Sequence, residues 1–481
     1  MIPSKKTISA YLQELAKQEP DKKLLGNPAG WMTCSQVWNR TQSIALQLRS
    51  QGLRPGDVVA LQTKRCLETV LVIFALRLLG TTVVLADPHH EPEQQLRDCE
   101  TPIFPRGVLC FTQDNRLSLS MDAKTTFIRF IAEQSRGKLP LLGDAQSPGF
   151  VIFTSGSTGK QKAVVLCDYN VVNNLLDSHP LGCYSEDDIA LGAIPLEHVF
   201  GLVLLAGTAV LRYAMYLPAA TDVDAILGCI EQEKITRING VPSLYQAMAA
   251  RCGGFDVSSL RAGFIGGAPE TTERLLRLEA QLGMTLVPVY GMSECIGISC
   301  ADGREPAELR ARGVGRVYPM NTVKLLGEDG NSVKPGEIGE ITVYSPARML
   351  GYWGSPMAPE AFLPTGDLGY LDANGILHIC GRKKELIIRN GRNIAPKKIE
   401  DALLSLPGVY AAAVVGMPDE LVGEVPYAMI VGVADPAELK KLLPKNELPV
   451  GILCAEELPM TASGKPDKLQ IKEVLRKWKN G

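Results

Sequence analysis

The stretch Phe153-Thr-Ser-Gly-Ser-Thr-Gly-Lys-Gln-Lys-Ala-Val-Val165 joins two strand-like runs through a loop of small and hydroxylated residues. Gly156 and Gly159 allow the backbone to approach a ligand closely. Consecutive N–H groups in such a turn form a concave anion-binding surface, and Lys160 and Lys162 add positive charge. The segment therefore predicts a polyphosphate-binding loop between two strands, held at the edge of a buried sheet.

Two other interpretations of this loop fit less well. The P-loop pattern G-x-x-x-x-G-K-[ST] requires glycine where Thr154 stands and Ser or Thr where Gln161 stands. It also requires a helix next, whereas residues 163–166 are apolar and strand-like. A plain Gly/Ser surface hairpin is the second alternative, and the apolar runs on both sides of the loop argue against it.

Length and composition limit the class of protein. A chain of 481 residues exceeds one ordinary core and suits two or three domains. With 46% hydrophobic and 21% charged residues the composition is that of a soluble globular protein, and a net charge of −2 gives no electrostatic reason to expect nucleic acid or an anionic membrane. The longest apolar stretches, 69–79 and 199–211, are shorter than the ~20 residues of a membrane span.

The cysteines and histidines give no metal site. The 12 cysteines are scattered without a C-x-x-C pair, and the 5 histidines form no cluster with ligand spacing. No secretory signal pattern opens the sequence. We therefore expect a cytoplasmic protein with reduced cysteines and no zinc.

The order of helical and strand-like segments predicts an α/β fold. Helical spacing at 8–16, 34–52 and 66–79 alternates with strand-like runs at 57–62 and 81–86, and the same alternation recurs near 190–195, 237–242, 262–265 and 285–290. We expect a large N-terminal domain, residues 1–381, of mostly parallel sheets covered by helices, with a small β subdomain at about 315–380. A basic run opens a small, mobile α+β C-terminal domain, residues 382–481.

Further motifs follow the loop along the chain, and they are informative together rather than one by one. They are Pro195-Leu-Glu-His-Val-Phe-Gly201, Gly266-Gly-Ala-Pro269, Tyr290-Gly-Met-Ser-Glu294, Gly339-Glu340 with Gly351-Tyr-Trp353, residues 365–370, residues 381–385 with Gly391, and residues 459–465. Together and in this order they resemble the adenylate-forming (AMP-binding) superfamily of acyl- and aryl-CoA ligases, peptide-synthetase adenylation domains and luciferases. The resemblance covers almost the whole chain.

The resemblance implies an ATP site with magnesium. The residues implied in holding the ATP phosphates are Thr154, Ser155, Gly156, Ser157, Thr158, Gly159, Lys160 and Lys162. Those implied around adenine are Gly266, Gly267, Ala268, Tyr290, Gly291 and Met292, with the Tyr290 ring on the base. Ser293 is implied at the α-phosphate, Glu294 as the magnesium ligand with Thr154 as a weaker one, and Asp367 with Arg382 at the ribose hydroxyls.

The resemblance also implies a moving C-terminal domain. Lys465 matches the lysine that bridges the substrate carboxylate and the α-phosphate during adenylation, and Lys384 matches the hinge. In the second conformation the stretch around Gly391 would replace Lys465 and line the thiol tunnel. The basic run from Arg382 to Lys398 suits CoA phosphates or an acidic carrier protein, and a solvated surface is the alternative.

The acyl pocket is implied to be apolar. Its expected walls are His198, Phe200, Ile265, Gly266, Val289, Cys295 and Gly297, with His198 gating the pocket and the thiol tunnel. Amino-acid-activating relatives carry a Phe-Asp-containing motif where this chain has His198, so an aryl or medium-chain acid is expected. A core histidine is the alternative for His198. Gln161 replaces a common proline and is expected to loosen the phosphate loop.

The leading functional hypothesis is an ATP-dependent carboxylic acid–CoA ligase that acts through an acyl-adenylate. One alternative thiol is the phosphopantetheine of an acyl carrier protein. A catalytically silent nucleotide-binding relative is the alternative from another class, and it is disfavoured by the presence of Lys162, Glu294, Asp367, Arg382 and Lys465. The expected partners are a small carboxylic acid and the thiol carrier, with no nucleic acid and no membrane span.

Overall fold

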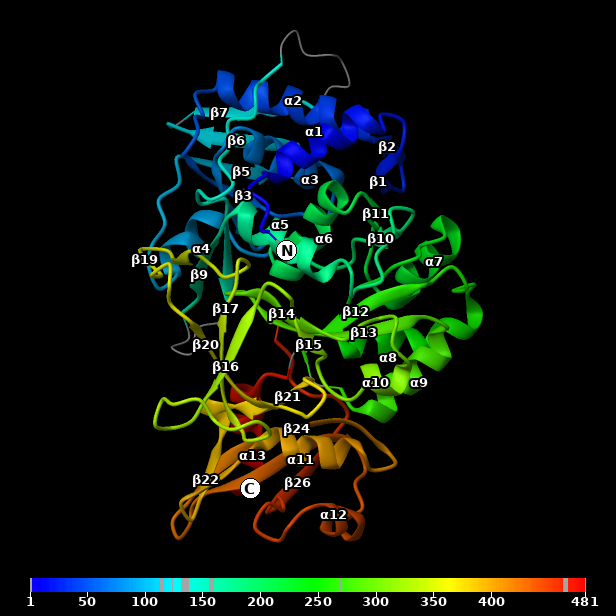
Figure 1. The fold of residues 1–481 in the computed structure, drawn as a ribbon, viewed down its shortest axis with the longest axis vertical. Helices are drawn as coiled ribbons and strands as arrows, with labels where there is room; N and C mark the ends of the chain where they lie inside the picture. The colour runs from blue at the N-terminus through cyan, green and yellow to red at the C-terminus, as the bar shows by residue number, and fades with distance from the viewer. Residues whose placement is uncertain are drawn as a thin grey trace.

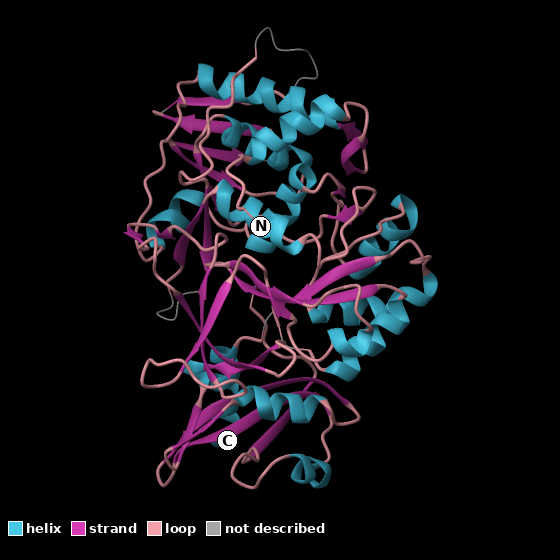
Figure 2. Cartoon of the chain, viewed as in Figure 1, coloured by secondary structure: helices cyan, strands magenta, loops and turns pink. Residues whose placement is uncertain are grey.

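The structure is a computed structural model that describes residues 2–112, 114, 116–122, 124–130, 138–154, 160–268, 270–461 and 466–480. Helices and strands alternate through a large N-terminal part, and a small α+β part lies at the other end of the long axis (Figures 1 and 2). The expected α/β class, with a large N-terminal and a small C-terminal domain, is confirmed. No helix in the described part of the chain has the length and hydropathy to cross a bilayer.

The longest sheet, here called the central sheet, carries the phosphate-loop strands. Its order is β19 (Ser355–Pro356), β18 (Gly351–Tyr352), β9 (Lys162–Leu166), β8 (Phe150–Thr154), β4 (Thr82–Ala86), β3 (Val58–Gln62), β5 (Gly107–Phe111), β6 (Leu117–Met121) and β7 (Lys124–Phe127). The inner strands β8, β4, β3 and β5 run parallel, and antiparallel pairs complete both sides. The expected loop between two strands is therefore the β8–β9 connection.

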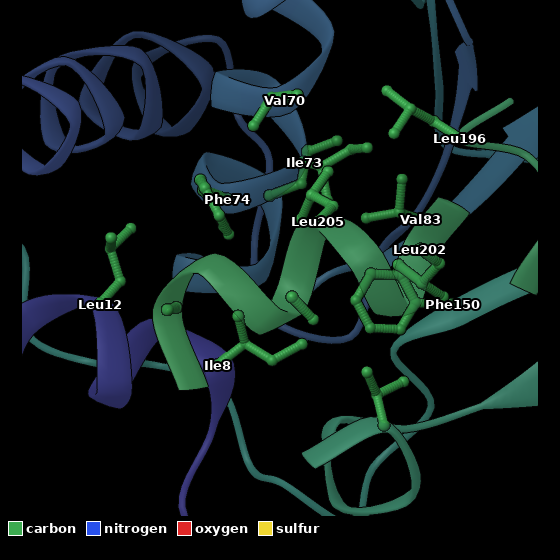
Figure 3. Packing of buried hydrophobic residues seen from close by; sticks show 14 of the residues in the cluster. Ile8, Leu12, Val70, Ile73, Phe74, Val83, Phe150, Leu196, Leu202 and Leu205 are labelled. Atoms are coloured by element: carbon green, nitrogen blue, oxygen red, sulfur yellow. The ribbon is translucent and has the colours of Figure 1, made fainter. Parts of the chain in front are cut away.

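Helices cover this sheet and enclose its core. They are α1 (Ile8–Gln18), α2 (Cys34–Ser50), α3 (Leu67–Leu78), α4 (Pro92–Asp98), α5 (Asp168–Ser178) and α6 (Val199–Val210). The apolar run at 199–211 forms α6, which is too short for a membrane span and is buried on almost all sides. Figure 3 shows Leu202 and Leu205 of α6 among Ile8, Leu12, Val70, Ile73, Phe74, Val83 and Phe150. Each such buried side chain contributes about 1.5–3 kcal/mol.

Two further sheets extend the N-terminal part. One has the order β10 (Ile189–Leu191), β11 (Ala214–Tyr216), β1 (Lys23–Asn27) and β2 (Gly30–Thr33), and the other has the order β12 (Ala262–Gly266), β13 (Thr285–Met292), β14 (Ile296–Cys300) and β15 (Arg316–Val317). Around them lie α7 (Val223–Glu233), α8 (Pro242–Arg251), a 3-10 turn (Cys252–Gly254), α9 (Thr272–Leu282) and α10 (Ala307–Arg310). The strand expected at 237–242 forms only isolated bridges at Arg237 and Gly240.

Short antiparallel strands follow, as the change in pattern after residue 315 predicts. They are β16 (Thr322–Leu326), β17 (Gly339–Tyr344), β20 (Leu363–Leu371) and β21 (Leu377–Arg382). A 3-10 turn (Lys383–Glu385) leads from β21 to the last sheet.

The C-terminal part builds a core of its own. Its sheet contains β23 (Arg392–Ile394), β22 (Ile387–Arg389), β25 (Gly423–Gly432) and β24 (Val409–Asp419), with β26 (Gly451–Ala455) paired to β25. The helices are α11 (Pro396–Leu404), α12 (Pro436–Leu442) and α13 (Lys468–Asn480). The two core clusters here contain residues from 387 onward, and Arg274 of α9 donates to the Tyr410 carbonyl at 2.8 Å.

A buried ion pair joins three helices of the N-terminal part. Arg77 Nε on α3 lies 2.9 Å from Asp168 Oδ1 at the start of α5, and both side chains are almost completely buried. Asp168 Oδ2 also accepts the Ile8 N–H at the start of α1, at 2.9 Å. One carboxylate therefore compensates a buried guanidinium and caps a helix.

Asp168→Ala should lower the free energy of unfolding by about 3–5 kcal/mol, because it leaves the Arg77 guanidinium buried without its counter-ion. The control is Glu14→Ala on α1, which removes only the exposed partner of Lys6 and should cost less than about 1 kcal/mol. Denaturant unfolding of both variants measures the difference. Equal losses of unfolding free energy in the two variants would contradict a large contribution from the buried Arg77–Asp168 pair.

Candidate active site

The flanks of the phosphate loop lie at the ends of two paired strands. Thr154 ends β8, Lys162 begins β9, and the two residues are cross-strand partners. Lys162 Nζ lies 4.9 Å from the centre of the Tyr352 ring and 3.7 Å from Glu100 Oε2. Lys160 is exposed just before it. The other predicted loop residues, Ser155, Gly156, Ser157, Thr158 and Gly159, lie outside the described residues.

Tyr352 connects the lysine to the predicted magnesium ligand. Its hydroxyl donates to Glu294 Oε1 at 2.9 Å, and β18 holds Tyr352 opposite Val164 of β9. Burial and the charge of Glu294 raise the pKa of Tyr352 well above its usual value, so the phenol remains a neutral donor at physiological pH. The sequence motif around residues 351–353 contains Tyr352, but the pattern by itself indicates no role for this residue.

The chain packs closely at the ends of β12 and β13, where two glycines leave no room for a side chain. A Cβ on Gly266 would lie 2.7 Å from Val289 Cγ1, and a Cβ on Gly291 would lie 1.8 Å from the Ile296 carbonyl oxygen. Only glycine fits such contacts. The bulge between Tyr290 and Gly291 then turns the chain. Gly267 and Ala268 follow β12, while Met292 and Ser293 lie half-buried next to Glu294.

A buried carboxylate brings the predicted adenine and ribose residues together. Tyr290 Oη donates to Asp367 Oδ2 at 2.7 Å, and Arg382 Nε lies 3.2 Å from Asp367 Oδ1. Asp367 on β20 and Arg382 on β21 are cross-strand partners. Burial and the Asp367 charge raise the pKa of Tyr290 well above its usual value. Asp367 is buried, so its neighbours hold its carboxylate in place, whereas Arg382 is largely exposed and its side chain has room to change conformation.

The predicted acyl-pocket residues separate into three groups. Phe200 and Val289 pack in one cluster with Phe264 and Tyr318, and Gly297 lies against the Tyr318 ring. Gly266 shares the Phe264 face of its strand and contacts Val289. Ile265 and Cys295 belong to other core clusters, so the structure does not bring their side chains to Phe200. His198 is half-buried and precedes α6 as its N-cap residue.

Among the described residues beyond Arg382, Gly391 lies apart from this site. Gly391 is exposed in the turn between β22 and β23. Figure 1 shows β22 at the lower end of the long axis, far from β13. Lys384 lies in the 3-10 turn after β21. Lys465 lies outside the described residues.

Cys295 should resist alkylation in the native protein, because it is fully buried and burial raises the pKa of its thiol to about 12. At pH 8 about one molecule in ten thousand would then carry the reactive thiolate. Exposed Cys454 is the internal control and should label readily with iodoacetamide, as peptide mass spectrometry would detect. Labelling of Cys295 at the rate of Cys454 would mean that this residue does line an open pocket.

Comparison with known proteins identifies the family. The model of the AMP-binding enzyme family matches residues 12–353, and that of the AMP-binding enzyme C-terminal domain matches residues 398–465. The chain is 32% identical to indoleacetate–CoA ligase of Aromatoleum aromaticum, over 97% of this chain and 98% of that protein. It is 31% identical to feruloyl-CoA synthase of an Amycolatopsis species, over 95% and 96% of the two chains.

A solved structure agrees with these matches. The o-succinylbenzoate CoA synthetase (MenE) of Bacillus subtilis, in complex with an acyl-adenylate intermediate, superposes with a TM-score of 0.81. The alignment has 26% identity and covers 98% of each chain. The resemblance noted in the sequence motifs is thus confirmed, and this chain belongs to the AMP-binding enzyme family.

Proposed function

We propose that this protein is an ATP-dependent carboxylic acid–CoA ligase that forms an acyl-adenylate and transfers the acyl group to CoA. The observation that carries the proposal is that two polar clusters lie on one short segment. Tyr290 opens the segment and contacts Asp367, and Glu294 closes it and contacts Tyr352 beside Lys162. A nucleotide has its polar groups in the same order: base, ribose and phosphates.

The nucleotide would lie along this segment. The Tyr290 ring supports adenine, Asp367 accepts hydrogen bonds from the ribose hydroxyls, and Lys162 faces the phosphates. The Glu294 carboxylate has the hard oxygen ligands that suit Mg²⁺. Among the described residues no group of three His, Cys, Asp or Glu side chains is placed to bind a metal, so ATP oxygens and water would complete the coordination. Bound magnesium supplies neutralisation of phosphate charge.

The reaction requires positive charge and positioning rather than a covalent enzyme intermediate. A carboxylate oxygen of the acid forms a bond to the α-phosphorus, and the bond from that phosphorus to the β-phosphate oxygen breaks, which releases pyrophosphate. Lys162 stabilises the departing phosphates, while Lys465 and the Ser293 hydroxyl act at the carboxylate and the α-phosphate. The CoA sulfur then attacks the acyl carbon, and AMP leaves.

The relatives favour CoA as the thiol and an apolar acid as the substrate. Both curated relatives above are named for CoA thioesters of aryl-containing acids, so a carrier-protein acceptor is not favoured. The cluster of Phe200, Phe264, Val289 and Tyr318 supports an aryl acid, with a medium-chain acid as the alternative. His198, two residues before Phe200 in sequence, would gate this pocket. A cytoplasmic location stays a prediction.

The contacts around Lys384 support a hinge at this residue, and so a boundary within a few residues of the expected one between 1–381 and 382–481. On the N-terminal side, Arg382 pairs with Asp367 and Lys383 Nζ lies 2.7 Å from Glu340. On the C-terminal side, Glu385 and Glu400 both pair with Lys468, at 2.6 and 3.0 Å. Lys384 is the residue between these two sets of anchors. Rotation about it would bring Gly391 to the site in place of Lys465.

Acid-dependent ATP–pyrophosphate exchange across a library of carboxylic acids tests the function, followed by addition of CoA or of a pantetheinylated carrier protein. We expect exchange with aryl acids and thioester formation with CoA. Exchange with none of the acids would contradict the proposal, and transfer to the carrier protein alone would contradict the choice of CoA.

Asp367→Ala should lower kcat/KM for ATP by at least about tenfold, because hydrogen bonds to charged groups contribute about 1.5–3 kcal/mol each. Steady-state kinetics at varied ATP measures the effect. Asp329→Ala is the matched control, since this exposed aspartate lies in the β16–β17 turn of the same sheet. An unchanged ATP dependence in Asp367→Ala would reduce Asp367 to a structural role.

Lys384→Pro should preserve single-turnover pyrophosphate release and slow thioester formation by more than about tenfold, since proline fixes φ where the proposed rotation changes it. Lys384→Ala keeps backbone freedom and should support both steps. Quenched-flow assays of each half-reaction, with a melting curve, separate a locked hinge from an unfolded domain. A folded proline variant with normal rates for both steps would refute the hinge.

A further inference from the structure

Gln161, where proline is common in the family, is held by two hydrogen bonds. Its carbonyl oxygen accepts the Glu100 N–H at 2.8 Å, and its Oε1 accepts Gln95 Nε2 at 2.9 Å. Both partners belong to α4 or to the residues directly after it, and Figure 1 shows α4 beside β9. Gln161 itself is therefore held at its backbone and at its side chain. The expectation that it loosens the loop stays a prediction, because residues 155–159 lie outside the described residues.

The orientation of the Gln95 amide is fixed by a third group. Gln95 is 7% exposed, and its Oε1 accepts the Asp87 N–H at 2.9 Å. Because an N–H requires an acceptor, this contact assigns the oxygen to the Asp87 side and leaves the NH₂ group to donate to Gln161. Asp87 directly follows β4, which pairs with β8. The contacts thus run from the end of β4 through Gln95 to the residue before β9.

The next residue along the chain is Lys162. Its ammonium lies near both the Tyr352 ring and the Glu100 carboxylate, and Glu100 also supplies the N–H that binds the Gln161 carbonyl. Residues 95–100 therefore contact the Gln161 side-chain amide, the Gln161 backbone carbonyl and the Lys162 ammonium. A displacement of Gln161 would move the Lys162 backbone with it.

We propose that Gln95 is a positioning residue for ATP, which acts through Gln161 to fix the backbone that presents Lys160 and Lys162 to the phosphates. This inference rests on the proposed function. Proline at 161 would restrict φ by its own ring and would keep the carbonyl acceptor for Glu100. In this chain the Gln95–Gln161 hydrogen bond thus takes the place of the proline ring as the constraint on the backbone at position 161. The effect of Gln95 on ATP therefore requires glutamine at 161.

A double-mutant cycle of Gln95→Leu and Gln161→Pro tests this dependence. Each protein is assayed for ATP–pyrophosphate exchange, for ATP affinity by calorimetry, and for thioester formation from a supplied acyl-adenylate and CoA. Gln94→Leu is the control, because Gln94 lies on the same helix and donates to Asp98 rather than to the loop. Melting curves accompany all variants.

Gln95→Leu should weaken ATP binding and lower kcat/KM for ATP by roughly 3- to 10-fold, the effect of one neutral hydrogen bond. Thioester formation from the supplied adenylate should not change, because the β- and γ-phosphates have already left. In the Gln161→Pro background the same substitution should change ATP binding less than about twofold, although the Asp87 N–H loses its acceptor in both backgrounds.

Three results would overturn the inference: no effect of Gln95→Leu on ATP, equal effects in both backgrounds, or equal losses in both half-reactions. A wild-type protein that binds ATP but exchanges pyrophosphate with no acid would defeat the proposed function instead. The calorimetric cycle would still decide the role of Gln95 in that case.

Discussion

The buried carboxylate of Asp367 is the contact on which the arrangement of the site depends. It accepts a hydrogen bond from Tyr290 and pairs with Arg382, so it joins the end of β13 to the β20–β21 pair that leads into the hinge. A buried carboxylate is costly unless it is paired or hydrogen-bonded. The same groups that satisfy Asp367 therefore hold the Tyr290 ring, which we propose supports the base, beside the carboxylate that we propose accepts the ribose hydroxyls. Under the proposed function, fold stability and nucleotide geometry would depend on the same contacts.

A second set of contacts orders the phosphate end of the site. Tyr352 donates to Glu294, and its ring lies against the Lys162 ammonium. Tyr352 therefore contacts both the lysine proposed to face the phosphates and the carboxylate proposed to bind magnesium. Both ends of the site use a neutral phenol whose pKa is raised by burial and a neighbouring carboxylate. The phenols donate hydrogen bonds without adding charge, so under the proposed function the lysines and the metal would balance the phosphates.

The sequence predicted the strands on both sides of the loop, where local patterns carry the information. Apolar runs on both sides of the loop predicted strands at 149–153 and 163–166, and the structure has β8 at Phe150–Thr154 and β9 at Lys162–Leu166. Ile265 packs in another core cluster than Phe200, because successive residues of a strand face opposite sides and Phe264 with Gly266 share the other face. Strict alternation would have revealed this. The Gln95–Gln161 contact joins residues 66 positions apart on a short helix and a loop, so no local pattern could indicate it.

The structure of the protein with a non-hydrolysable acyl-sulfamoyl-adenosine tests the central claim most directly, since this compound has the parts of the proposed intermediate. Our account predicts the adenine ring against Tyr290, the ribose hydroxyls on the Asp367 carboxylate, and the acyl group toward Phe200 and Val289. Binding with the ribose away from Asp367, or with the acyl group outside that cluster, would contradict the account.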